Sequence, residues 1–177
     1  MPRNVEIKAR VRDPAQLRAR AQSVADGAPV EIQQDDIFFV CHSGRLKLRI
    51  FSESQGELIF YKRDDSPDPK ESQYVVTPTS TPHQLRETLA LALGECGRVR
   101  KKRILFLAGK TRIHLDEIEG LGHFMELEVV LSDGETVTQG IETAHRVMQQ
   151  LGVNDQDLVD RAYVDLLQET REGQVDL

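Results

Sequence analysis

The sequence predicts an α+β fold with about eight strands, about four helices and a large or closed antiparallel sheet. Short segments such as Asn4-Val5-Glu6-Ile7-Lys8-Ala9-Arg10-Val11 alternate between apolar and charged residues, which is typical of strands because strand side chains point to opposite faces with period two. Other segments carry apolar residues along one helical face. Turn residues separate many of the strand-like segments, which favours antiparallel pairing.

The first half of the chain is expected to contain five strands and two helices. Asp13-Pro14 and Thr81-Pro82 are typical helix starts, because proline is favoured in the first turn. Gly27 and Gly94 are expected to end these helices, and the proline-rich segment 64–69 predicts a loop. The expected strands lie at 4–12, 30–40, 45–50, 57–63 and 71–77.

The second half repeats this plan with three strands and two helices. A helix is expected at 136–151, where Val137, Ile141 and Ala144 share one face, and a final helix is expected at 155–169. Residues 1–170 are expected to form a single domain, with residues 171–177 as a frayed tail. The expected strands lie at 98–107, 110–117 and 123–131.

Composition limits the class of protein. The 177 residues are 39% hydrophobic and 29% charged, as in a globular domain. No apolar run reaches membrane-spanning length and the N-terminus has no apolar signal region, so a cytoplasmic protein without a membrane partner is expected. A net charge of −6 argues against nucleic acid as a partner, since that partner requires a basic surface. Cys41 and Cys96 lack metal-ligand spacing and are expected to be reduced thiols.

The charged faces of the strands have two possible environments. In the ordinary arrangement the apolar faces form the core and the charged faces meet water. In a closed barrel, helices cover the apolar faces from outside and the charged faces line a lumen. The signs of charge favour the lumen: Arg45, Lys47 and Arg49 make one segment basic, and Glu126 and Glu128 make another acidic, whereas a solvated face gains from mixed signs.

A lumen that holds many charges has a large desolvation cost unless a ligand compensates it. A polyanion together with a divalent metal would do so. A triphosphate carries about four negative charges for lysine and arginine, and its oxygens share Mg²⁺ or Mn²⁺ with carboxylates. The residues therefore favour a polyanion, for which a triphosphate is suitable, together with Mg²⁺ or Mn²⁺ as the cofactor.

The sequence resembles the CYTH domains, or triphosphate tunnel metalloenzymes, a family that includes CyaB-type (class IV) adenylyl cyclases, thiamine triphosphatases and inorganic triphosphatases. The resemblance runs from Glu6 to Tyr163, and its specificity lies in the order and spacing of the motifs. The part from His114 to Phe124 is most similar to the CyaB-type branch. The matching segments are 4–8, 46–49, 62–63, 99–103, 114–116, 120–122, 126–128 and 161–163.

This resemblance implies a closed eight-stranded tunnel with the triphosphate inside. It implies metal ligation by Glu6, Asp116, Glu126 and Glu128. The phosphate-binding residues that it implies are Lys8, Arg10, Lys47, Arg49, Arg63, Lys101, Arg103, Arg112 and Arg161. Catalytic roles are expected for Lys8, Glu6, Glu126 and Glu128. Arg63 is preferred to Lys62 at the hairpin position because it shares strand parity with Tyr61.

One residue departs from the family pattern. Asn4 stands where the N-terminal signature has its first glutamate, so a negative charge is lost beside the expected metal site. The favoured activity is CyaB-like cyclisation of ATP to cyclic AMP and pyrophosphate, and the alternative is hydrolysis of inorganic tripolyphosphate or thiamine triphosphate. The third hypothesis is a non-catalytic module that binds a triphosphate or a nucleotide. In each case the protein is expected to be a monomer or a homodimer. His114 has the parity of Arg112 and Asp116, so it either lines the lumen or is structural.

Overall fold

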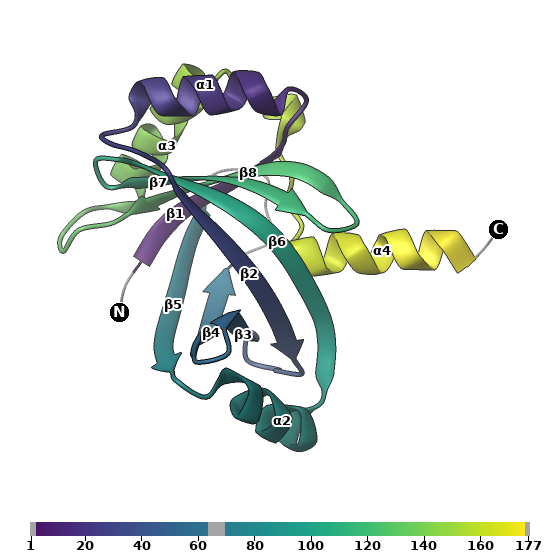
Figure 1. Cartoon of the computed structure of the whole chain (residues 1–177). Helices are drawn as coiled ribbons and strands as arrows, with labels where there is room; N and C mark the ends of the chain where they lie inside the picture. Colours follow the sequence, from purple (N-terminus) through teal and green to yellow (C-terminus); the bar gives the residue numbers. More distant parts are fainter. Residues whose placement is uncertain (1–2, 64–69, 176–177) are drawn as a thin grey trace.

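The computed structural model describes residues 3–63 and 70–175, which form a closed antiparallel barrel with helices outside (Figure 1). The strand order is β1-β5-β4-β3-β2-β6-β7-β8, and β1 closes the ring by pairing with both β5 and β8. The expected α+β fold with a closed eight-stranded barrel is confirmed. The strands are β1 (Arg3–Arg10), β2 (Val30–Phe39), β3 (Arg45–Ser52), β4 (Gln55–Arg63), β5 (Lys70–Thr79), β6 (Glu95–Ala108), β7 (Thr111–Ile118) and β8 (Gly122–Val130).

The register of the strands decides which side chains point inward. Glu6 lies opposite Glu128 and Lys8 opposite Glu126, so these even-numbered positions of β1 and β8 share one face. Ile7, between them, is buried on the other face among helix residues. The charged faces therefore line the interior and the apolar faces lie outside under the helices, as the segregation of charge predicted.

Three helices cover the outside of the barrel on two sides (Figure 1). α1 (Pro14–Val24) and α3 (Val137–Leu151) pack over β1, β6, β7 and β8, and α2 (Pro82–Leu93) packs over β2, β3 and β4. α1 begins where the Asp13 carboxylate accepts a hydrogen bond from the N–H of Gln16. α3 begins with reciprocal hydrogen bonds between Thr136 and Gln139. None of the described helices is long and apolar enough to cross a membrane.

The final helix starts later than the sequence predicted. A short 3₁₀ turn occupies Asp155–Asp157, the chain then runs extended, and α4 spans Tyr163–Val175. The physical reason is a set of backbone contacts with β1: Leu158 forms a β-bridge with Ala9, and the N–H of Val159 donates to the carbonyl oxygen of Lys8. These bonds satisfy the backbone in place of a helix. α4 then points away from the barrel, and its helical backbone continues beyond residue 170 (Figure 1).

The start of α4 covers one end of the barrel. Ala162 and Tyr163 pack against Phe38, Val99 and Phe124, which come from three different strands. The Phe124 and Tyr163 rings meet edge to face with their centroids 5.2 Å apart. This apolar cluster gives the interior an apolar floor, and the charged side chains lie above it.

Candidate functional site

The barrel encloses a cavity of about 310 Å³, which we call the tunnel. Side chains from all eight strands line it. Its volume is within the range of small-molecule sites, and ionisable side chains make up nearly half of its lining residues. The lining cations are Lys8, Lys47, Arg49, Lys101, Arg103 and Arg112. The lining carboxylates are Glu6, Asp36, Glu57, Glu126 and Glu128.

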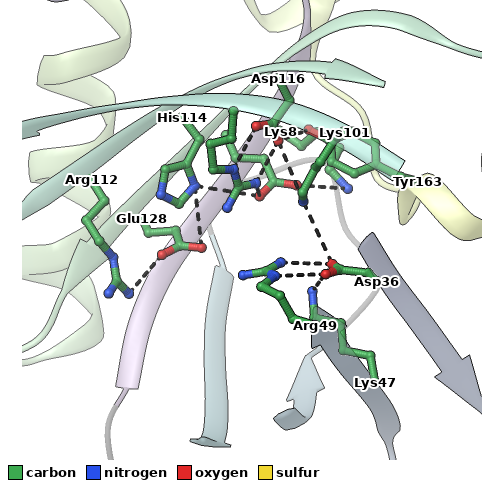
Figure 2. A network of polar contacts seen from close by, with 12 residues as sticks. Lys8, Asp36, Lys47, Arg49, Lys101, Arg112, His114, Asp116, Glu128 and Tyr163 are labelled. Atoms are coloured by element: carbon green, nitrogen blue, oxygen red, sulfur yellow. Dashed lines mark hydrogen bonds and ion pairs between the residues drawn. The ribbon is translucent and has the colours of Figure 1, made fainter. Parts of the chain in front are cut away.

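Asp36 holds a group of cations on one side of the tunnel (Figure 2). It lies opposite Arg49 in the β2–β3 register and accepts two hydrogen bonds of 2.8 Å from it. Lys47 donates to the same carboxylate at 2.9 Å, and the Lys101 ammonium is 4.0 Å away. Burial alone would raise the pKa of Asp36, but Arg49 and Lys47 outweigh burial and hold that pKa well below its ordinary value. Asp36 is therefore a buried anion that positions two expected phosphate-binding residues.

Asp116 has a similar role near the floor. It accepts hydrogen bonds of 2.7 and 2.6 Å from Arg103 and one of 3.0 Å from the Tyr163 hydroxyl. Burial favours a higher pKa for Asp116, but Arg103 and Lys101 outweigh it and lower the pKa. The resemblance implied a metal ligand here. The structure instead engages this carboxylate with Arg103 and Tyr163, which favours a positioning role.

Two buried lysines lie over the floor. The Lys8 ammonium is 3.9 Å from the centre of the Tyr163 ring, donates to the Arg161 carbonyl oxygen at 3.1 Å and is 3.5 Å from Glu126. Lys101 is 5.2 Å from the same ring. Burial, followed by repulsion from Arg103, lowers the pKa of Lys101 to about 7. Lys101 is thus poised to gain a proton when an anion approaches.

An acidic group with one imidazole faces the lysines. His114, Glu126 and Glu128 offer ligand atoms that all lie within 4.8 Å of one another. Arg103 donates to Glu126 at 3.1 Å, and Arg112 pairs with Glu128 at 2.8 Å. Burial opposes the ionised form of both carboxylates. Lys8 outweighs burial at Glu126, and the side chains of His114 and Arg112 outweigh it at Glu128, so both pKa values are lowered. Ionised carboxylates beside an imidazole are ligands that suit a divalent metal.

Two of the expected residues lie outside the tunnel lining, and a third is described only by its backbone. Arg10 is exposed, lies over the Phe124 ring at 5.2 Å and is not part of the tunnel lining. The Arg161 side chain is 47% exposed and pairs with Glu169 on α4, and only its backbone carbonyl meets Lys8. Arg63 pairs with Ser72 through its backbone, and its side chain lies outside the described part of the chain.

Among the tunnel-lining residues that sequence reasoning missed, which include Gln34 and Glu57, the most consequential is Asp36. It belongs to a segment with two successive aspartates, and strand parity alone does not say which of them points inward. The signal lies in the pairing: Asp36 faces basic Arg49, whereas Asp35 pairs with Arg98 outside the tunnel lining. His114, which the sequence left open, lines the tunnel and is 5% exposed.

The family model of the CYTH domain matches residues 2–163. The chain belongs to the CYTH family.

Relatives of this CYTH chain are distant in sequence and close in fold. A candidate adenylate cyclase of Methanocaldococcus jannaschii is 26% identical over 76 residues, so the match spans 43% of each chain. The PH1012 protein of Pyrococcus horikoshii has 20% identity, a TM-score of 0.83 and coverage of 93% of this chain and 99% of its own. A Hippeastrum protein, described as a candidate adenylyl cyclase with a dominant triphosphatase activity, has 13% identity, a TM-score of 0.63 and 96% coverage of both chains. These structural likenesses show a shared fold.

The tunnel of this CYTH protein holds polar atoms that lack partners. Among the described residues, the buried side-chain atoms without a hydrogen-bond partner are Asn4 Oδ1, Gln34 Oε1, Arg112 Nε and His114 Nδ1. All four residues line the tunnel. Buried polar groups are normally paired, so these acceptors and this donor mark the tunnel as a site built for a ligand. The oxygen and imidazole atoms suit a cation, and the arginine N–H suits an anion.

Proposed function

We propose that this protein is a divalent-metal-dependent enzyme that acts on a triphosphate held in the tunnel, with cyclisation of ATP to cyclic AMP and pyrophosphate as its reaction. The observation that carries the proposal is one cavity that combines six buried or half-buried cations, an acid–imidazole group and four unpartnered polar atoms. We place the activity in the cytoplasm, where free thiols such as Cys41 and Cys96 stay reduced.

The charge of the tunnel supports binding of a metal complex. The described lining has six cations and five carboxylates, so the site is close to neutral when the histidine is neutral. A free triphosphate, with about four negative charges, would leave a large excess of negative charge in a low-dielectric cavity. A divalent cation entering with the triphosphate reduces that excess. Metal is therefore needed for binding as well as for chemistry.

The residues of the chain account for positioning and charge stabilisation. Lys47 and Arg49 on one wall, and Lys8 and Lys101 over the floor, can meet phosphate oxygens by direct hydrogen bonds. His114, Glu126 and Glu128 fit a divalent metal, which when bound supplies Lewis-acid polarisation of phosphate oxygens. Phosphoryl and nucleotidyl transfer needs mainly in-line positioning and electrostatic stabilisation, which this lining provides.

An apolar part of the lining favours a nucleotide over bare tripolyphosphate. Ile32, Phe51, Val76 and Leu105 line the tunnel together with Glu57. Inorganic tripolyphosphate has no group that gains from apolar contacts, whereas a purine buries its faces against such side chains. The Glu57 carboxylate adds an acceptor for an exocyclic amine. These residues support a nucleoside triphosphate as the substrate.

Hydrolysis is the second candidate function. The Hippeastrum protein with triphosphatase activity shares the fold over 96% of both chains. The two reactions differ in the nucleophile: the ribose 3′-hydroxyl attacks the α-phosphorus in cyclisation, and water attacks a terminal phosphorus in hydrolysis. The same cations and acidic group would serve both.

The deciding experiment measures cyclic AMP, pyrophosphate and orthophosphate released from ATP, tripolyphosphate and thiamine triphosphate, each with Mg²⁺, Mn²⁺ or chelator. Cyclic AMP with pyrophosphate, abolished by chelator, is the expected result. Orthophosphate without cyclic AMP would replace the cyclase with a triphosphatase. Metal-dependent binding of ATP without any product would indicate a binding module, and Asn4→Glu would then test whether the lost carboxylate explains the inactivity.

A further inference from the structure

His114 lies between the two carboxylates of β8. It pairs with Glu126 in the β7–β8 register, and Glu128 is the next inward residue on β8. Its Nδ1 is 3.9 Å from Glu126 Oε2 and 3.8 Å from Glu128 Oε1 (Figure 2). The imidazole nitrogen is thus almost equally far from two acidic oxygens, and the side chain is 5% exposed.

The distances are too long for hydrogen bonds. An N–H···O bond has its heavy atoms about 2.7–3.2 Å apart, and His114 Nδ1 has no hydrogen-bond partner although it is buried. A buried imidazole nitrogen without a hydrogen-bond partner is available as a metal ligand.

The carboxylates are also oriented for a shared ligand. Arg112 pairs with Glu128 through Oε2, and the other oxygen, Oε1, is the one near the imidazole. Lys8 pairs with Oε1 of Glu126. The other oxygen of Glu126, Oε2, is the one near the imidazole, and Arg103 also contacts it. Figure 2 shows Glu128 between Arg112 and His114. Arg112 thus holds Glu128 and Lys8 holds Glu126, while one carboxylate oxygen of each glutamate faces the imidazole Nδ1.

We infer that His114, Glu126 and Glu128 form a mixed nitrogen–oxygen ligand set that prefers Mn²⁺ or another first-row transition ion over Mg²⁺. The inference rests on the proposed function, because it takes the metal of that function to bind at these three residues. Metal–ligand bonds of about 2.0–2.2 Å bring donor atoms to about 3–4 Å from one another, so small side-chain rotations from the observed spacing, within 4.8 Å, are enough.

The preference follows from the nitrogen ligand. Mg²⁺ selects oxygen ligands in near-ideal octahedral geometry and keeps much of its water, whereas imidazole strengthens binding of the later first-row ions. His114 is then a residue that determines metal specificity.

The test uses electron spin-echo measurements of Mn²⁺ bound to the full-length protein, without substrate and with tripolyphosphate. Wild type is expected to show the hyperfine coupling of a directly bound nitrogen, and His114→Gln is expected to lose it. His145→Gln, an exposed helix position, is the matched control and is expected to keep the coupling. Mn²⁺ bound to wild type without nitrogen coupling would overturn the inference and leave the proposed function standing.

Binding constants from calorimetry give the second readout. His114→Gln is expected to weaken Mn²⁺ binding by about 10–100-fold and Mg²⁺ binding by less than about threefold, by analogy with the loss of a supporting residue at a metal site. If His114→Gln unfolds at the wild-type temperature and its affinities for Mn²⁺ and Mg²⁺ fall by the same factor, the inferred preference for Mn²⁺ is overturned. Failure of every divalent ion to bind wild type, with or without tripolyphosphate, would overturn both the inference and the proposed function.

Discussion

At the scale of single residues, the tunnel is organised by buried acids that hold cations in place. Asp36 and Asp116 are 1% and 2% exposed, and each binds a guanidinium through two hydrogen bonds. Such pairs bring little net stability, because burying both charges is costly, but losing one partner leaves the other buried and uncompensated. Their value here is the fixed placement of cations before a ligand arrives.

Asp36→Asn should therefore destabilise the ligand-free protein by about 3–5 kcal/mol, since Lys47 and Arg49 lose their buried counter-ion. Added tripolyphosphate with Mn²⁺ should restore part of this loss by supplying phosphate oxygens. Urea unfolding with and without these ligands measures both effects. The control is Asp35→Asn, which breaks a half-exposed ion pair with Arg98 and should cost about 0–1 kcal/mol. Equal losses in the two variants would show that Asp36 has no special role.

Lys101 leads to a prediction about protons. Its pKa of about 7 in the free tunnel makes it mostly neutral at pH 8, and a bound phosphate should raise that pKa and restore the charge. Binding of Mn²⁺–tripolyphosphate should thus take up more protons at pH 8 than at pH 6, where Lys101 is already protonated. Calorimetry in buffers of different ionisation enthalpy measures the uptake, and Lys101→Met should remove the difference. An unchanged proton count in that variant would assign the uptake to another group.

At the scale of elements, α3 reaches the barrel only because residue 140 has no side chain. A Cβ built on Gly140 would lie 2.7 Å from Val5 Cγ2 and 2.6 Å from Leu131 Cδ2, which is closer than packed carbons come. The glycine thus allows the helix backbone to lie against the outer face of β1, whose inner face carries Glu6 and Lys8.

Gly140→Ala should consequently destabilise the fold by about 1–3 kcal/mol, although alanine is the better helix former by about 1 kcal/mol. Gln149→Ala, on the exposed side of the same helix, should be close to neutral. Thermal unfolding of both variants gives the comparison. A stabilised Gly140→Ala protein would mean that α3 moves outward without loss.

At the scale of the whole molecule, the tunnel's balance of charge predicts that metal and triphosphate bind together. Saturation at about 100 times Kd adds about 2.7 kcal/mol of stability, which for a chain of this size is a rise of about 5–10 °C in Tm. Mn²⁺ with tripolyphosphate should give a rise of this order, and either one alone much less. Scanning calorimetry of the four combinations tests this, with sulfate as a control for ionic strength. A full rise with tripolyphosphate and chelator would contradict the coupling.

Much of this architecture can be predicted from the sequence, because strand faces and helix starts depend on residues that are close together in the chain. The alternation of Glu6, Ile7 and Lys8 predicts an inner and an outer face, and the one-sided charge of β3 and β8 predicts which face is inner. Helix starts at Pro14 and Pro82 agree with the structure for the same reason. These features need no knowledge of distant contacts.

The remaining features depend on long-range contacts that no local pattern contains. The extended course of 158–162 is fixed by bonds to β1, and Arg161 is turned outward to Glu169 as a result. Asp36 points inward and Asp35 outward only because β2 lies between β3 and β6 in a particular register. The roles of Arg10 and Arg161 as phosphate ligands stay predictions that their positions do not favour.

The apolar floor formed around Tyr163 also has a kinetic consequence. Ala162 and Tyr163 cover one end of the barrel, while Val76, on the lining, is 40% exposed, so solvent reaches the cavity on the side of Val76. Under the proposed function, a substrate that enters there with its phosphates toward Lys8 and Lys101 is expected to release its products in a fixed sequence. The nucleoside part, nearer the entrance, leaves first, and the phosphate part, which entered first, leaves last.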